Sequence, residues 1–281
     1  MTRLILAATG CVFAAASSAQ TSVSFASPTF DRWNYPFNTT VPLGSRTAAS
    51  TFSSGTIPGL FDDRDAQFLN SFITAGDFAP NQGASNYIIT SATATATLVG
   101  GEFHYESSFT DAGSIDLFGT AFRNGLNAFA YGDDLPFAFG DPTLEDVRNA
   151  YATDNLGGSL RDVSNNIRDG FTPTPFAVGQ IIGETSGTTV IGAGQTVEFT
   201  LDLNNPDVVS YLQNALNQGI VSLSLTSTHV AAQGGPLVFP VFGTSEGGTP
   251  MTLDLTVQIV PAPASMAILG LGGLAAIRRR R

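Results

Sequence analysis

The feature that most constrains the fold of this chain is a two-residue alternation of apolar and polar side chains in several separate segments. Val221, Leu223 and Leu225 alternate with serine and threonine, and similar patterns recur in residues 89–98, 197–203 and 253–259. Successive side chains of a β-strand point to opposite faces of a sheet, so the pattern is typical of half-buried strands. Turn-forming Gly, Ser, Asn and Pro separate the segments. We therefore predict a mainly β protein built as an antiparallel β-sandwich rather than a parallel α/β sheet.

Two short helices are predicted to interrupt the strands. The first begins at Pro206 after an Asn205 cap and ends before Gly219, because proline suits a first helical turn and glycine commonly follows the last. Its apolar stripe consists of Val208, Val209, Leu212, Ala215 and Leu216. The second is expected after Pro142, with Leu144, Val147 and Tyr151 on one face. We expect both stripes to pack on the sandwich rather than to bind a partner.

The C-terminal segment, residues 261–281, has a different composition from the rest of the chain. Pro261, Ala262 and Pro263 are followed by an uncharged run from Ala264 to Ile277, and the chain ends in Arg278, Arg279, Arg280 and Arg281. A membrane-spanning helix usually needs about 20 apolar residues. This run is shorter, so we expect either local thinning of the bilayer or entry of the flanking residues into the membrane interface. The arginines resist translocation and hold that end in the cytoplasm. The two prolines keep the backbone extended and accessible to a protease, whereas the alternative is a buried core helix that ends in arginines.

This order of proline motif, apolar helix and arginine cluster resembles the PEP-CTERM tail, a sorting signal of exported bacterial proteins that exosortase-type membrane enzymes handle. The family motif is Pro-Glu-Pro, and Ala262 stands in the place of the glutamate. The resemblance implies an exported protein of the cell envelope or extracellular surface, held in the membrane by a short transmembrane helix before processing. It also implies a link to extracellular polysaccharide.

The N-terminus has the three-part layout of a secretory signal peptide. Arg3 precedes an apolar stretch from Leu4 to Ala16, and small residues lead to a predicted cleavage site after Ala19. The alternative is lipoprotein processing before Cys11, which would leave an apolar region of about six residues, shorter than the usual 7–15 or so. In either case the exported portion has no pair of cysteines for an internal disulfide. The predicted organisation is a signal peptide (1–19), one β-sandwich ectodomain (20–260) and a sorting tail (261–281).

The charge of the exported portion excludes one class of partner. Without Arg3 and the four terminal arginines, 7 basic residues stand against 23 acidic ones, a net charge of −16. Nucleic-acid binding requires clustered cationic side chains, so a nucleic-acid partner is not expected. The acidity favours solubility and leaves room for a divalent cation.

The order of features in the ectodomain is similar to that of DNRLRE-type jelly-roll domains. An Asp/Arg-rich strand entry (residues 61–69) precedes a Thr/Ala strand, and later come a strand, the capped helix, a second strand, a turn at Thr244-Ser245-Glu246 and a closing strand from Pro250. The similarity covers residues 22–260 and is strongest after residue 195. It implies a β-sandwich of the kind found on extracellular bacterial proteins.

One segment matches a catalytic motif in its residue types. Residues 243–247 read Gly-Thr-Ser-Glu-Gly, which satisfies the Gly-x-Ser-x-Gly nucleophile elbow. The elbow needs a helix after the serine and a histidine later in the chain. A strand is predicted after Ser245 and no histidine follows it, so His229 could serve only in another chain order. We interpret the segment as a turn and predict no catalytic residue.

Two groups of residues are candidates for holding a metal ion. Glu102, His104 and Glu106 share one face of a predicted strand at about 7 Å spacing and could give part of a zinc site, although the alternative is a solvated sheet face. The aspartate clusters could supply oxygen ligands to a structural calcium ion, without matching the Asp-x-Asp-x-Asp-Gly loop. These clusters are Asp62, Asp63 and Asp65; Asp133 and Asp134; and Asp202 and Asp207.

Alternating aromatic residues near the predicted mature N-terminus are the candidate sugar-binding patch. Trp33, Tyr35 and Phe37 could stack against sugar rings, or they could close one end of the sandwich. The leading hypothesis is a structural or adhesive surface protein without catalytic activity and without a required cofactor. The alternatives are an extracellular carbohydrate-binding module and, ranked below it, a secreted hydrolase.

Overall fold

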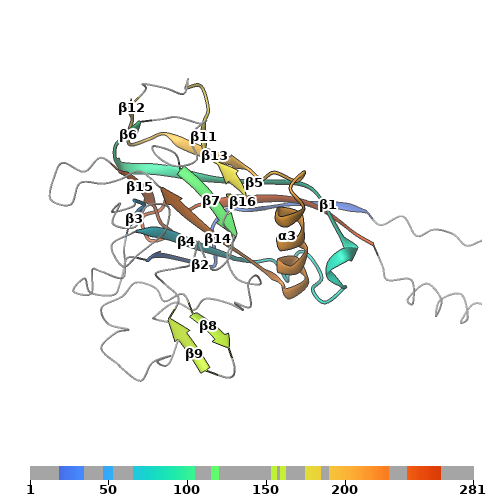
Figure 1. The fold of residues 1–281 in the computed structure, drawn as a ribbon. Helices are drawn as coiled ribbons and strands as arrows, with labels where there is room; N and C mark the ends of the chain where they lie inside the picture. Colours follow the sequence, from blue (N-terminus) through green and yellow to red (C-terminus); the bar gives the residue numbers. More distant parts are fainter. Residues whose placement is uncertain are drawn as a thin grey trace, which may run out of the picture.

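The computed structural model describes residues 19–34, 47–52, 66–104, 115–119, 153–156, 159–162, 175–184, 190–227 and 239–260. Within these ranges the chain is mainly β, with antiparallel sheets and one α-helix (Figure 1). Each of the four alternating segments contributes to a strand, so the prediction of a β-rich, sandwich-like fold is confirmed.

The first sheet is built around one long strand, β5 (Tyr87–Gly101). In order across the sheet, the strands are β1 (Gln20–Phe25), β16 (Thr252–Ile259), β5, β13 (Thr196–Thr200) and β11 (Gln180–Ile181). The C-terminal part of β5, past the residues that pair with β16, pairs with β15 (Pro240–Gly243). β15 in turn pairs with β3 (Ala48–Ser50). β16 is thus the last strand in the sequence of the described residues, and yet it lies between β1 and β5.

The second sheet has β14 at its centre. Its order is β10 (Ala177–Val178), β7 (Ile115–Gly119), β14 (Ile220–Ser227), β4 (Gln67–Ile73) and β2 (Phe30–Asn34). Two short ladders lie outside the main sheets: β6 (Phe103–His104) with β12 (Val190–Ile191), and β8 (Thr153–Leu156) with β9 (Ser159–Asp162).

The chain passes from one sheet to the other at both pairs of edges. On one side, residues 26–29 connect edge strand β1 to edge strand β2. On the other side, Gly179 alone separates β10 from β11, and a Cβ at this position would come within 2.5 Å of Val197 Cγ1. Both crossings limit the length of free strand edge, which would otherwise pair with other chains.

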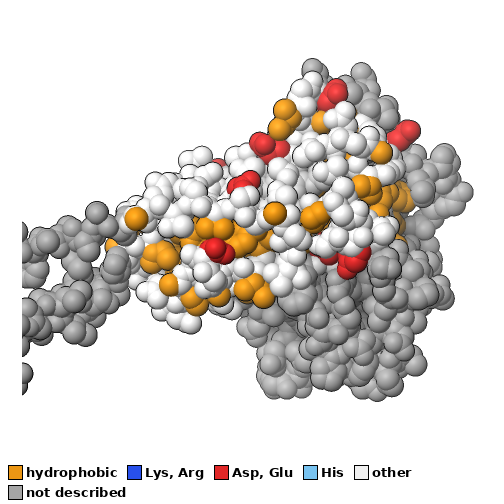
Figure 2. Space-filling view, turned by 180° about the vertical axis from the view of Figure 1, so that it is seen from behind, with side chains coloured by type: hydrophobic (Ala, Val, Ile, Leu, Met, Phe, Trp, Pro, Cys, Tyr) orange, Lys and Arg blue, Asp and Glu red, His pale blue; other side chains and the backbone are white. Residues whose placement is uncertain are grey.

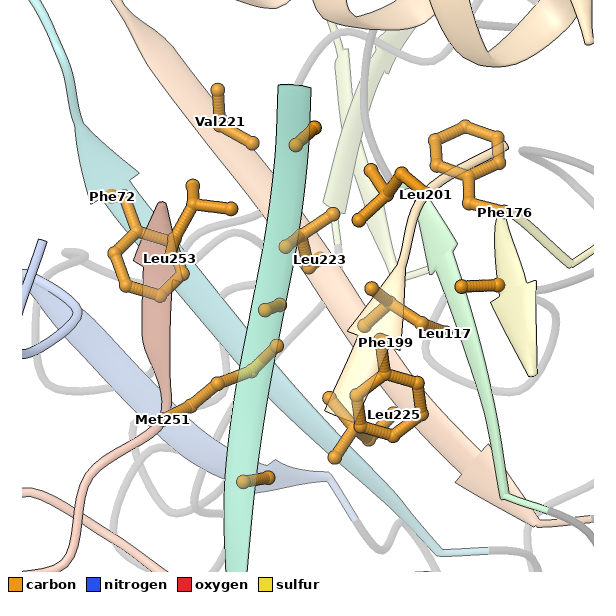
Figure 3. Close-up of a cluster of buried hydrophobic side chains, with 14 of the residues drawn as sticks. Phe72, Leu117, Phe176, Phe199, Leu201, Val221, Leu223, Leu225, Met251 and Leu253 are labelled. Atoms are coloured by element: carbon orange, nitrogen blue, oxygen red, sulfur yellow. The ribbon is translucent and has the colours of Figure 1, made fainter. Parts of the chain in front are cut away.

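The core lies between the two sheets and is filled by the inward positions of their strands. On β5 these positions are mainly alanines (Ala92, Ala94 and Ala96), so larger side chains of other strands fit against this strand. Figure 3 shows the arrangement: Phe199 and Leu253 of the first sheet lie near Leu223 of the second, within one continuous cluster. Removal of this apolar surface from water is the main stabilising term, because a chain with one cysteine has no internal disulfide.

The single helix among the described residues, α3 (Pro206–Gln218), begins and ends where the sequence predicts. Asn205 Oδ1 accepts the Asp207 N–H at 3.0 Å, and Gly219 has φ 83°, the left-handed conformation that glycine adopts most easily. The helix packs against β5, β14 and the 3₁₀ turn η1 (Ala84–Asn86). Its predicted stripe is confirmed except that Tyr211 is buried and Val209 is half-buried. The helix predicted after Pro142 lies outside the described residues.

The expectation of half-buried strands is wrong for β14. Its outward residues Ser222, Ser224 and Thr226 are buried, as is Gln67 on the neighbouring strand. Hydrogen bonding offsets part of the cost of this burial for Ser222 and Ser224, because Ser222 Oγ lies 2.8 Å from Ser71 Oγ and Ser224 Oγ donates to Gln67 Oε1 at 3.4 Å. The alternation on β14 therefore separates a buried apolar face from a buried polar face. It does not separate a core face from a solvent face.

The predicted signal peptide (1–18 of its 19 residues) and the predicted sorting tail (261–281) lie outside the described residues. In the part of the chain that the structure describes, no helix has the length and hydropathy needed to span a membrane.

Candidate functional site

The two ends of the described sandwich chain lie side by side. β1 and β16 are antiparallel neighbours, and Gln20, which follows the predicted signal-peptide cleavage site, is the register partner of Gln258. Val260, the last described residue, continues this pairing through its N–H, which donates to Asn86 O at 2.8 Å. We call this end of the sandwich, formed by the start of β1, the start of β5 and the end of β16, the root end (Figure 1).

The root end carries few charges and several exposed apolar side chains. Its segments, residues 19–25, 73–91 and 255–260, contain one charged residue, Asp77. Ile88 is 44% exposed and Val260 is 38% exposed, and they are diagonal neighbours on the outer face of the first sheet because Ile88 is the partner of Gln258. Ile73, at the end of β4, is 48% exposed. Residues 20–260 are strongly acidic, so the root end differs in composition from the rest of this region.

The outer face of the first sheet is rich in hydroxyl groups. Threonine and serine occupy most outward positions of four adjacent strands: Ser22 and Ser24 on β1; Thr252 and Thr256 on β16; Thr90, Ser91, Thr93, Thr95 and Thr97 on β5; Thr196 and Thr200 on β13. We call this surface the hydroxyl face. Glu198 and Asp254 are its carboxylates, and no Lys or Arg occurs on these four strands.

Several of these hydroxyl groups pair across strands. Thr95 Oγ1 lies 2.6 Å from Thr252 Oγ1, and Ser22 Oγ lies 3.0 Å from Thr256 Oγ1. Each hydroxyl has one donor and two acceptor positions, so a cross-strand pair leaves further hydrogen-bonding capacity directed outward. The face therefore presents many hydrogen-bond donors and acceptors outward.

The Gly-x-Ser-x-Gly segment forms a turn, as predicted. β15 ends at Gly243, the chain turns through Thr244–Gly248, and the next regular element is strand β16 and not a helix. Gly247 N–H donates to Thr244 O at 3.0 Å, and Gly248 has φ 76°. A Cβ on Gly247 would come within 2.2 Å of Thr47 O, so close packing of the turn explains this glycine.

A buried carboxylate that the sequence did not point to holds this turn. Asp31, on β2 and 2% exposed, accepts the Ser245 N–H at 2.7 Å and the Ser245 hydroxyl at 3.0 Å, both at Oδ2. Ser27 Oγ lies 3.1 Å from Ser245 Oγ. Because β2 belongs to the second sheet and the turn leads into the first, the contact joins the two sheets. The Ser245 hydroxyl acts here as a donor to a structural carboxylate.

Comparison with protein-family models, curated proteins and solved structures finds no match to this chain.

Neither histidine side chain is among those that the structure describes. His104 lies on β6 with its backbone opposite Val190, and its side chain is not among those described. His229 lies outside the described residues.

Where the structure describes a candidate metal ligand, the local surroundings of that residue account for its position. Glu102 is exposed beside β6, and Glu106 lies outside the described residues. Asp202 Oδ1 accepts the Asn204 N–H at 2.9 Å, and Asp207 lies in the first turn of α3. Within the described ranges, no three His, Cys, Asp or Glu side chains gather closely enough to hold an ion. Asp62, Asp63, Asp65, Asp133 and Asp134 lie outside these ranges.

Trp33 occupies a core position. It is 7% exposed, belongs to the hydrophobic core cluster, and donates its indole N–H to Ser50 O at 2.8 Å. This placement gives little free ring surface for stacking on a sugar and corresponds to the alternative interpretation of this residue. Tyr35 and Phe37 lie outside the described residues.

Proposed function

We propose that this chain is an exported structural or adhesive surface protein, without catalytic activity, whose C-terminal tail is recognised by an exosortase-like membrane enzyme. The observation that carries the proposal is the pairing of Gln20 with Gln258. It brings the exit of the predicted signal peptide and the entry of the predicted sorting tail to the same end of the sandwich. Both membrane-directed segments can thus reach one bilayer while the sandwich stays folded.

The location of Ser245 supports a role other than catalysis. Its hydroxyl donates to Asp31, which is bound in the same way by the Ser245 backbone N–H. A nucleophilic serine requires a base that accepts its proton and an approach for the substrate. Asp31 accepts a hydrogen bond from the hydroxyl but is buried, and the contact stabilises a tight turn.

The hydroxyl face supports the adhesive part of the proposal. Extracellular polysaccharides present dense hydroxyl groups, and a flat array of threonine and serine can exchange hydrogen bonds with them over a large area. The face lies along the side of the sandwich, so a polymer can contact it while the root end is at the membrane. A carbohydrate-binding module that uses this face, and not Trp33, is the second candidate function.

Sorting is tested in cells that contain the exosortase-like enzyme and in cells that lack it. Mass spectrometry of the exported protein should find a C-terminus near residues 261–263 only when the enzyme is present. A matched variant with Arg278–Arg281 replaced by serine should escape membrane retention. An intact Arg281 in exported material from enzyme-containing cells would refute processing.

Adhesion is tested by sedimentation of the full chain with insoluble extracellular polysaccharide. Thr93→Lys places a long charged side chain in the middle of the hydroxyl face and should abolish binding. Ser85→Lys adds the same side chain to the exposed turn η1, away from that face, and should leave binding unchanged. Equal binding by both variants would exclude the hydroxyl face as the contact surface.

A further inference from the structure

We propose that the root end of the sandwich rests in the lipid headgroup layer, with Ile88 and Val260 in contact with the bilayer. This inference rests on the proposed function, because it takes the tail to be inserted in the membrane. It adds that the folded ectodomain itself is a membrane-contacting surface with a defined orientation. The occupant of the exposed apolar patch is therefore lipid.

The length of chain between the sheet and the tail restricts where the root end can lie. The N–H of Val260 is still hydrogen-bonded to Asn86 O at 2.8 Å, so regular pairing extends to the last residue before Pro261. The uncharged run begins at Ala264, four residues later. A fully extended chain covers at most about 3.6 Å per residue, so Val260 lies within ~14 Å of the start of the membrane segment. This distance is comparable to the depth of the headgroup region, and no spacer holds the sandwich farther away.

The shortness of the membrane segment draws the root end closer still. Its 14 uncharged residues, Ala264 to Ile277, would form a helix of about 21 Å. The hydrocarbon core of a typical bilayer is about 30 Å thick, and a short span is accommodated by local thinning or by flanking residues that enter the interface. The arginines oppose entry on the cytoplasmic side. On the other side the flank is the root end of the sandwich, which must supply the missing apolar contact.

The surface of the root end is suited to that position. Ile88 and Val260, 44% and 38% exposed, lie side by side where the chain leaves the sheet. Figure 2 shows apolar side chains reaching this end of the molecule. A polybasic surface would bind anionic headgroups, but the described segments that form the root end contain no Lys or Arg, so the proposed contact is apolar. The scarcity of carboxylates avoids both repulsion from anionic lipid and the cost of placing them in the interface.

The proposal is tested with the full chain, carrying Cys11→Ser and exported by a host that lacks the sorting enzyme, so that the tail is retained. A fluorophore is attached at Ile88→Cys, and the protein is reconstituted into phosphatidylcholine vesicles that contain headgroup-nitroxide lipids. The matched control is Val99→Cys, which lies on the outer face of the same strand and is 39% exposed. The two positions are separated by eleven residues of β5, or about 36 Å.

We expect severalfold stronger quenching at Ile88→Cys than at Val99→Cys. Vesicle flotation is measured in parallel, together with a variant that ends at Val260 and should not float. If the full chain floats but quenching is equal at the two positions, the orientation is refuted while the proposed membrane anchoring stands. If the full chain does not float, the anchoring fails and the inference fails with it.

Discussion

Mutation of the contact between Asp31 and Ser245 is the best test of whether the Gly-x-Ser-x-Gly turn has a structural or a catalytic role. The perturbation is a double-mutant cycle of Asp31→Ala and Ser245→Ala. Two hydrogen bonds join the residues, at 2.7 Å from the Ser245 N–H and at 3.0 Å from its hydroxyl. Ser245→Ala removes only the second, whereas Asp31→Ala removes both.

The expected magnitudes follow from these two contacts. A hydrogen bond to a charged group contributes about 1.5–3 kcal/mol to stability, and the exposed Ser245 can be rehydrated when its partner is lost, which favours the lower figure. We therefore expect Ser245→Ala to lower the free energy of unfolding by about 1.5 kcal/mol and Asp31→Ala by ~3 kcal/mol or more. The coupling energy should be about 1.5 kcal/mol, since the cycle subtracts what Asp31 does with other partners.

The assay is equilibrium urea unfolding of residues 20–260, supported by thermal denaturation. For a domain of this size 1 kcal/mol shifts the melting temperature by about 2–4 °C, so Asp31→Ala should melt ~6–12 °C below the parent. The matched control is Ser22→Ala, which removes an exposed serine hydroxyl that pairs with Thr256 at 3.0 Å. This control should change stability by no more than about 0.5 kcal/mol.

Two results would contradict the reasoning. A coupling energy below about 0.5 kcal/mol lies within the additivity expected of independent sites and would mean that the hydrogen bond from the Ser245 hydroxyl to Asp31 does not stabilise the turn. Ester hydrolysis by the parent that disappears in Ser245→Ala, with little change in stability, would show instead that the serine is a nucleophile.

The other predictions concern the helix, its contacts and the packing of β5. Asn205→Ala removes the cap of α3 and should cost about 1 kcal/mol, whereas Asn205→Ser should restore most of the loss, as measured by urea unfolding. Gly219→Ala forces a φ of 83° on a residue whose new Cβ would lie 2.8 Å from Ala75 Cβ, so a loss of at least ~1–2 kcal/mol is expected; an unchanged melting temperature would contradict the conformation. Tyr211→Phe deprives the buried Ser222 N–H of its 3.2 Å partner and should cost about 1–3 kcal/mol, visible as loss of amide protection in hydrogen exchange. Ala94→Leu adds volume to a fully buried position and should cost ~1–3 kcal/mol, and a stabilised variant would show that the core beside β5 is loosely packed.

The elements that depend on local pattern were predictable from the sequence. Alternation located parts of β5, β13, β14 and β16, and the residues Asn205, Pro206 and Gly219 gave the limits of α3. These signals act within a few residues: a cap is a contact between neighbours, and alternation follows from the pleat of a single strand.

The contacts that define the candidate sites are not local, and no short pattern encodes them. Asp31 and Ser245 are separated by 214 positions, and the carboxylate stands in a segment without any motif. The buried polar side of β14 was missed for a related reason, because alternation distinguishes two faces and does not tell what covers each of them. The pairing of β1 with β16 likewise depends on the assembly of the whole sheet.

The position of β16 has a consequence for the order of events in the export proposed above. Because the last strand lies between β1 and β5, the segment that emerges first has no neighbour until the final residues of the ectodomain have crossed. An N-terminus-first passage therefore leaves the first sheet incomplete throughout threading, and such distant pairing carries a large entropic cost until then. In the proposed export, the first sheet can close only when Ile259 has emerged, just as the predicted tail reaches the bilayer. Completion of the first sheet and the proposed capture by the membrane would then coincide, so the chain would stay unfolded during transport and fold when transport ends.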